Sequence, residues 1–235
     1  NQSLRSEQAK TRTNGDGFGI GWYSEGAEPG VYREVMPAWS DENLLSLART
    51  LKSHLFFAHV RAATGTPIAR QNCHPFRRGR WLFMHNGQIG GYAQVRRALE
   101  ARLPDALYAA RQGATDSELL FLLALARIEQ RGERVHDAMR ATLDETMALM
   151  RAHGISEPLR FSAALADGQR LHLFRCASDD APPTLYVKQG ERGTLVASEP
   201  LAGGDDGWRA LGNGEMLTLT RASARARSGA ALVAA

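Results

Sequence analysis

The sequence has only two cysteines, Cys73 and Cys176, in 235 residues. Two are too few for a disulfide framework, so we expect a reducing, cytoplasmic setting. It also lacks an apolar run long enough to span a bilayer, so no membrane partner is expected. Lysine is scarce: most of the 29 basic side chains are arginine, scattered along the chain rather than gathered into a stripe. The net charge of +4 therefore predicts a solvated surface and no nucleic-acid partner.

What is present is enough apolar sequence, 43% of all residues, for a sizeable core. The capping box Thr115-Asp116-Ser117-Glu118 opens a helix that is apolar nearly all round and is therefore expected to be buried. Other helices are expected after a cap at Ser40, over residues 92–103 and over residues 135–150. The predicted strands are residues 18–23, 31–36, 55–60, 80–84, 160–165, 170–174, 184–187, 194–198 and 216–220.

This order of elements predicts one α+β domain with two antiparallel sheets and helices outside them. Asp167-Gly168 stands between two predicted strands and indicates a hairpin. We expect the domain to cover residues 1–221. Residues 222–235, rich in alanine and arginine, predict a flexible tail or a short helix.

Polar groups stand at the ends of three of the buried elements. Arg61 follows the strand at 55–60, Asn86-Gly87 comes shortly after the strand at 80–84, and Asp116 opens the buried helix. A guanidinium suits a carboxylate, an aspartate suits an ammonium, and an amide beside a backbone N–H suits an oxyanion. Together these groups would clamp an α-amino acid during acyl transfer.

Each of these groups also has a plain structural interpretation. Asn-Gly is the commonest hairpin turn, Arg61 could end its strand in water, and Asp116 could be favoured by the helix dipole alone. Spacing in the sequence does not show whether the three groups meet.

The motifs, taken in order, resemble those of the class II glutamine amidotransferases, which are N-terminal-nucleophile hydrolases. The match is to the small stand-alone type, and it implies a four-layer αββα sandwich. It covers residues 1–208 and is carried by Asn14-Gly15-Asp16-Gly17-Phe18-Gly19-Ile20-Gly21-Trp22, His59-Val60-Arg61-Ala62-Ala63-Thr64-Gly65, Asn72-Cys73-His74-Pro75-Phe76, Met84-His85-Asn86-Gly87 and Thr115-Asp116-Ser117-Glu118.

The resemblance implies a role for each matching residue. Arg61, helped by Thr64 and the Gly65 backbone, would bind the glutamine α-carboxylate, and Asp116 would bind the α-ammonium. The Asn86 side chain and the Gly87 N–H would form the oxyanion hole. His74 would line the site, although a histidine that braces the loop before Pro75 is the alternative.

The family nucleophile is a cysteine at the mature N-terminus whose α-amine serves as the base. Position 1 here is Asn1, and the resemblance places that cysteine and its strand upstream. Cys73 lies beside His74, but neighbours in an extended segment point to opposite faces, and Cys73 has no free amine. Cys176 lies in a predicted strand and is interpreted as a small core residue.

We therefore expect a glutaminase-type amidohydrolase that acts on glutamine or a γ-glutamyl amide through an N-terminal cysteine. No cofactor or metal is expected, and any ammonia-accepting chemistry would belong to a separate synthase. Three alternatives remain open. They are a γ-glutamyl-conjugate hydrolase of a small-molecule biosynthetic pathway, a non-catalytic amino-acid-binding module, and a nucleic-acid binder with a strongly salt-dependent affinity.

Overall fold

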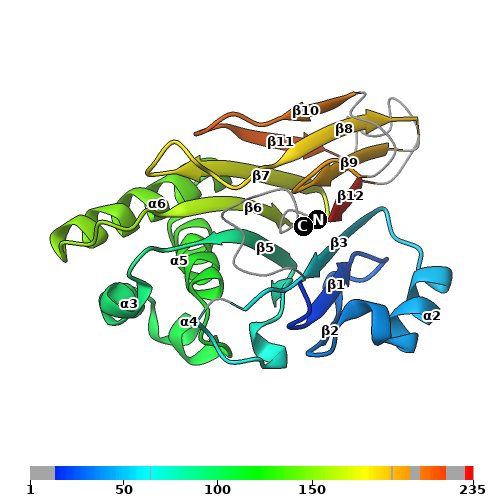
Figure 1. Ribbon diagram of the computed structural model, residues 1–235, viewed down its shortest axis with the longest axis horizontal. Helices are drawn as coiled ribbons and strands as arrows, with labels where there is room; N and C mark the ends of the chain where they lie inside the picture. The colour runs from blue at the N-terminus through cyan, green and yellow to red at the C-terminus, as the bar shows by residue number, and fades with distance from the viewer. Residues whose placement is uncertain (1–13, 64, 192, 202–206, 221–230, 235) are drawn as a thin grey trace.

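The computed structural model describes residues 14–63, 65–191, 193–201, 207–220 and 231–234, which form two stacked sheets with helices outside them (Figure 1). Within these residues, sheet A has the strand order β10-β8-β9-β12-β3-β1-β2, and sheet B has the order β11-β7-β6-β5-β4. The strands of sheet A are β1 (Phe18–Trp22), β2 (Gly30–Glu34), β3 (Leu55–Val60), β8 (Tyr186–Gly190), β9 (Gly193–Ala197), β10 (Trp208–Ala210) and β12 (Ala231–Ala234). Those of sheet B are β4 (Phe76–Arg78), β5 (Trp81–Gln88), β6 (Arg160–Ala166), β7 (Arg170–Ala177) and β11 (Met216–Thr220).

Strand β3 has the predicted limits, and its position fixes the start of the segment that carries Arg61. It pairs antiparallel with β1, with Val60 opposite Phe18. The pairing continues past the strand, because Arg61 N donates to Gly17 O at 2.8 Å and Asp16 N donates to Arg61 O at 3.0 Å. The backbone of Arg61 is therefore held by the chain just before β1.

Strand β5 is longer than the sequence predicted. It runs through His85 to Gln88 and pairs with β6, with Gly87 opposite Phe161. The hairpin interpretation of Asn86-Gly87 is therefore wrong. Gly87 has a φ of 140°, and a Cβ atom there would lie 2.0 Å from Arg160 O, so only glycine continues the strand here. The predicted hairpin at Asp167-Gly168 is confirmed, because it joins β6 to β7.

The helices are α2 (Glu42–Thr50), α3 (Tyr92–Glu100), α4 (Asp105–Ala110), α5 (Asp116–Arg131) and α6 (Val135–Ala152), with single 3₁₀ turns η1 (Ala38–Ser40) and η2 (Arg70–Asn72). Helix α5 begins where the capping residues predicted: Thr115 Oγ1 accepts from Glu118 N at 3.1 Å, and every residue of Ser117–Leu125 is buried. The cap of α2 is Asp41, which accepts from Leu44 N at 2.7 Å, and not Ser40, which lies in η1. Helix α4 and strands β4 and β10 were not predicted from the sequence.

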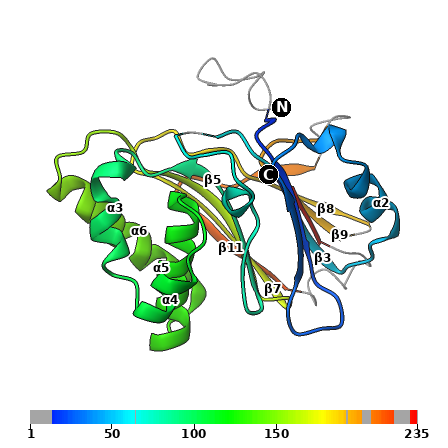
Figure 2. The same ribbon diagram turned by 90° about the horizontal axis from the view of Figure 1, so that it is seen from below.

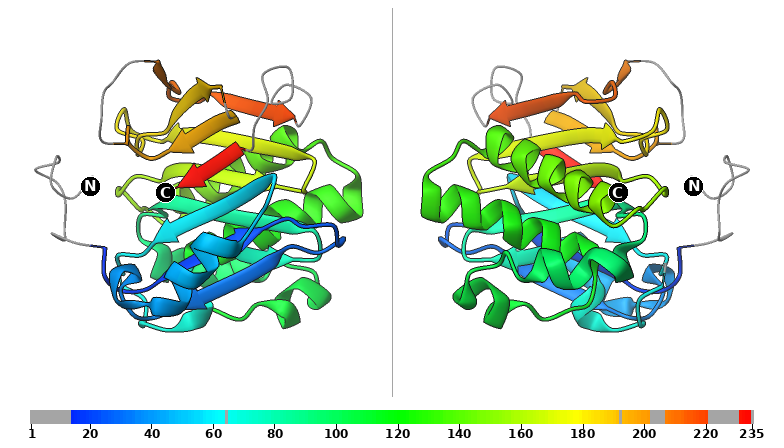
Figure 3. Two further views of the ribbon diagram at one scale, coloured as in Figure 1. Left: turned by 90° about the vertical axis from the view of Figure 1, so that its right-hand side faces the viewer. Right: turned by 90° about the vertical axis from the view of Figure 1, so that its left-hand side faces the viewer.

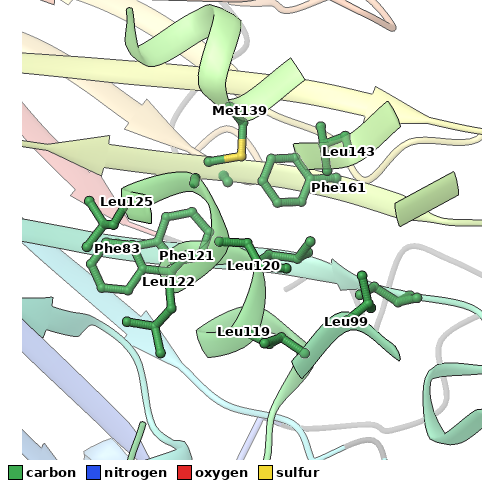
Figure 4. Packing of buried hydrophobic residues seen from close by; sticks show 14 of the residues in the cluster. Phe83, Leu99, Leu119, Leu120, Phe121, Leu122, Leu125, Met139, Leu143 and Phe161 are labelled. Carbon is green, nitrogen blue, oxygen red and sulfur yellow. The ribbon is translucent and has the colours of Figure 1, made fainter. Parts of the chain in front are cut away.

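The layers follow one another from helices α3–α6 through sheet B and sheet A to α2 (Figure 2). Alternate side chains of β5 pack on the two faces of sheet B, because successive side chains in a strand point to opposite faces. Leu82 and Met84 pack between the two sheets, whereas Phe83 packs against the helices. There the Phe83 and Phe121 rings stack with centroids 5.2 Å apart (Figure 4). The predicted α+β class, with two sheets between helices, is confirmed.

Residues 222–230 and 235 of the expected flexible tail or short helix lie outside the described residues, and the four residues between them differ from that expectation. Residues Ala231–Ala234 form β12, which lies between β3 and β9 and is parallel to both (Figure 3). Sheet A is thus not purely antiparallel. The pairing partners of β12 are distant in sequence, and local composition carries no information about them.

No helix in the described parts of the chain is long and apolar enough to cross a membrane. Among the same residues, no cluster of three or more His, Cys, Asp or Glu side chains is arranged to hold a metal ion.

Candidate active site

The end of β5 and the start of α5 are joined into one rigid unit. Asp116 Oδ2 accepts from Ile89 N at 2.8 Å, directly after β5, and Asp116 Oδ1 accepts from Ser117 N at 2.8 Å. Asp116 is half-buried, as are Asn86 and Gly87. The structure therefore brings Asp116 to the end of the strand that carries Asn86-Gly87, as the clamp hypothesis requires.

His85 makes a second connection between the same two elements. Its Nδ1 lies 2.9 Å from Ser117 Oγ, and its Nε2 lies 3.3 Å from Arg160 O. A carbonyl only accepts, so Nε2 carries the proton, and Nδ1 of the neutral ring accepts from the serine hydroxyl. Burial lowers the pKa of His85, although the negative charge of Asp116 raises it in part. The net lowering keeps the ring neutral.

Asn86 points to the face of β5 opposite His85, because side chains alternate along a strand. This is the face of Met84, which packs between the sheets. Strand β3 contacts β5 on this side and is followed by Arg61. The amide of Asn86 is therefore directed toward the part of the molecule that carries Arg61.

Arg61 is buried and firmly held. Its side chain is 4% exposed, and the guanidinium donates to Thr66 Oγ1 at 2.7 Å, Pro67 O at 3.2 Å and Asp16 O at 3.4 Å. Asp16 holds the following residues as well, because its Oδ2 accepts from Ala63 N at 2.8 Å. These bonds use three of the five N–H donors of the guanidinium, so the group is oriented without being saturated by them.

Two neutral histidines lie beside Arg61. The His59 and His74 rings have centroids 4.3 Å apart, and His74 also contacts Phe76 at 4.6 Å. Burial, with a smaller contribution from His85, lowers the pKa of His59 to about 4. Burial likewise lowers the pKa of His74 well below its usual range, with His59 as the next cause. Both rings are uncharged near pH 7, so the positive charge in this region comes from Arg61 and Arg33.

The two cysteines have the environments of structural residues. Cys73 is fully buried, and its Sγ lies 3.5 Å from Glu34 O and 3.7 Å from Ala69 O. Burial raises the pKa of the Cys73 thiol, which disfavours the reactive thiolate. Cys176 lies in β7 and packs on the edge of the core between sheet B and the helices, where burial also raises its pKa.

Of the remaining predicted residues, Thr64 lies outside the described residues, and Gly65 is exposed with a φ of 79°. The sequence did not single out Asp16, Asn72 or Glu118 as important to the site. Asp16 supports the Arg61 segment, and Glu118 accepts from Gln112 N at 2.9 Å and Gly113 N at 2.6 Å. Their only signal was membership of the ordered motifs, because their contacts join separate segments.

Comparison with known proteins identifies one family. The family model of the class-II glutamine amidotransferases matches residues 2–186. The Saccharomyces cerevisiae protein named "Probable glutamine amidotransferase DUG3" is 32% identical, over 94% of this chain and 74% of its own length. The "Gamma-glutamyl-hercynylcysteine sulfoxide hydrolase" of Mycobacterium tuberculosis H37Rv is 30% identical, over 88% of this chain and 76% of its own length.

Solved structures give the same result. The glutamine aminotransferase class-II domain protein of Silicibacter pomeroyi is similar with a TM-score of 0.75 and 41% identity, over 87% of this chain and 88% of that one. The glutamine phosphoribosylpyrophosphate amidotransferase of B. subtilis aligns with a TM-score of 0.56 and 16% identity, over 89% of this chain and 42% of its own. At that identity, the second likeness supports the fold alone.

Proposed function

The chain belongs to the class II glutamine amidotransferases, and we propose that it hydrolyses the amide of glutamine or of a γ-glutamyl compound through a cysteine at its mature N-terminus. One observation carries the proposal. Asp116, the candidate for binding an α-ammonium, is bonded to the end of the strand that carries Asn86-Gly87, the candidate oxyanion donors. Groups built into paired strands and buried helices are held rigidly enough to be preorganised.

In the proposed mechanism, Arg61 binds the α-carboxylate of the substrate, with Thr64 and the Gly65 backbone, and Asp116 binds the α-ammonium. The cysteine thiol attacks the side-chain carbonyl while its own α-amine takes the proton. Negative charge then develops on the carbonyl oxygen, where the Asn86 amide and the Gly87 N–H donate to it. Ammonia or an amine leaves, and water hydrolyses the thioester to release glutamate.

The environment of Cys73 supports the N-terminal cysteine, rather than Cys73, as the nucleophile. Cys73 is fully buried, bonds to two backbone carbonyls and has a raised pKa. The neutral His74 beside it makes a ring contact with His59 and not a hydrogen bond to the thiol. A thiol in this state neither reaches a substrate nor ionises readily.

The leaving group defines two forms of the same activity. One relative is named as a hydrolase of a γ-glutamyl conjugate, which supports release of an amine from a conjugate. Others are named as glutamine amidotransferases, which supports release of ammonia, to be used by a separate synthase. Ammonia release from glutamine and amine release from a γ-glutamyl anilide, measured on the same preparation, distinguish the two.

The nucleophile is tested with the complete protein purified from its native source. A glutamine analogue that carries a diazoketone should add one adduct by intact mass, and peptide mapping should place it on an N-terminal cysteine. The Cys73→Ala variant should be labelled equally and remain active. Labelling at Cys73 would overturn the assignment. Tight glutamine binding without labelling or hydrolysis would instead establish an amino-acid-binding module.

A further inference from the structure

The two ends of the proposed clamp come from separate parts of the chain. Arg61 follows β3 of sheet A, whereas Asp116 opens α5, which packs on sheet B. An α-amino acid presents its carboxylate and its ammonium on one carbon atom. The two binding groups must therefore keep a fixed separation, although they belong to different layers.

One buried side chain connects the two segments. Asn72, at the end of η2, is 2% exposed. Its Nδ2 donates to Pro67 O at 2.9 Å, and its Oδ1 accepts from Ala114 N at 2.9 Å. Pro67 O is also the acceptor for Arg61 Nη2 at 3.2 Å. Ala114 lies just before Thr115, which caps the helix that Asp116 opens.

We propose that Asn72 is a positioning residue that sets the separation between the carboxylate-binding and ammonium-binding ends of the clamp. This role rests on the proposed function, because it presupposes that Arg61 and Asp116 bind one α-amino acid. Asn72 itself touches neither the substrate nor the reacting atoms. It acts through Pro67 on Arg61 and through Ala114 on the start of α5.

A side-chain amide fits both partners. Pro67 O can only accept and Ala114 N can only donate, so the position needs one donor and one acceptor. The partners also fix which way the amide points. An aspartate would lack the donor. Gly113 packs directly on this amide, since a Cβ atom on Gly113 would lie 2.5 Å from Asn72 Oδ1.

Glu118 holds the same loop in a different way. Its carboxylate accepts from the backbone N–H groups of Gln112 and Gly113, so it binds the loop to its own helix, α5. Asn72 takes the next N–H, that of Ala114, and binds the loop to the Arg61 side. Loss of Asn72 should therefore leave each end of the clamp supported locally and remove this side-chain connection between them.

The experiment compares two substrates on the complete protein. Glutamine carries both head groups, whereas glutaramate, which is glutamine without its α-amine, uses the carboxylate end alone. The ratio of their kcat/KM values measures how well Asp116 is placed relative to Arg61. In Asn72→Asp this preference for glutamine should fall about tenfold, the scale of one well-placed hydrogen bond to a charged group. Glutamine KM should rise while kcat for glutaramate changes little.

Asn213→Asp is the matched control. Asn213 likewise joins two segments, with Oδ1 accepting from Ala177 N at 3.0 Å and Nδ2 donating to Asp179 O at 3.4 Å, but it is exposed and contacts none of the site residues described above. Its preference for glutamine should match that of the wild type. Asn72→Ser, which buries no new charge, is measured in parallel, so that misfolding of one variant does not decide the outcome.

Three results separate the possibilities. A reduced preference in a folded Asn72 variant supports the positioning role. An unchanged preference, whether or not both activities fall together, overturns it and leaves the proposed function intact. A wild-type protein that hydrolyses neither glutamine nor a γ-glutamyl anilide overturns the proposed function itself, and the positioning role with it.

Discussion

Replacing Arg61 with lysine should weaken glutamine binding by a large and calculable factor. The guanidinium is 4% exposed and is oriented by Thr66 Oγ1, Pro67 O and Asp16 O. A lysine ammonium is a point charge and cannot keep these bonds while offering a planar fork to a carboxylate. Loss of one charged hydrogen bond costs about 1.5–3 kcal/mol, so glutamine affinity should fall roughly 10–150-fold.

The assay is calorimetric titration of the complete Arg61→Lys protein with a non-hydrolysed glutamine analogue, together with a melting curve. A ligand without the carboxylate, 4-aminobutanamide, should bind the variant and the wild type alike. Arg209→Lys is the control, because Arg209 is an exposed arginine that pairs with Glu215 at 2.7 Å, away from the site. Unchanged glutamine affinity in a folded Arg61→Lys protein would remove Arg61 from the site.

Two further predictions concern catalysis and pH. Asn86→Ala should lower kcat roughly a hundredfold or more with little change in KM or melting temperature; a destabilised variant with normal activity per folded molecule would refute the oxyanion role. Because burial lowers the pKa of His59 from 6.5 to about 4 and that of His74 well below its usual range, only the unfolded chain takes up these protons as pH falls below 6.5. The free energy of unfolding should therefore fall as the pH is lowered from about 6.5 to 4, by up to about 1.4 kcal/mol per pH unit for each histidine. Urea titrations that give the same free energy of unfolding across this range would contradict the buried, neutral state of the two histidines.

Elements with strong local signals could be predicted from the sequence. The start of α5 was readable because Thr115 caps it and the next residues are apolar on all sides. The β6–β7 hairpin was readable because Asp167 and Gly168 have the turn chemistry it needs. Even so, the capping box is only half formed, since Glu118 accepts from Gln112 N and Gly113 N.

The site was harder to predict, because its contacts join distant segments. Asn86-Gly87 has the local signal of a turn, and only its pairing with β6 shows that the strand continues through it. Asn72 stood out only as a member of one of the ordered motifs, since Pro67 and Ala114 become its neighbours only in the fold. Strand β12 was missed for the same reason, because its partners β3 and β9 lie far away in sequence.

The joining of Asp116 to the end of β5 also bears on how the site opens. One wall of the site, made of β5 and α5, is a paired strand and a buried helix, so its amide hydrogens should exchange only when the domain unfolds. The other wall, residues 65–72, is held largely by side-chain bonds from Arg61 and Asn72. Amide hydrogens of residues 65–72 should therefore exchange faster than those of β5 and α5, which makes the Arg61 side the more adjustable wall of the proposed site.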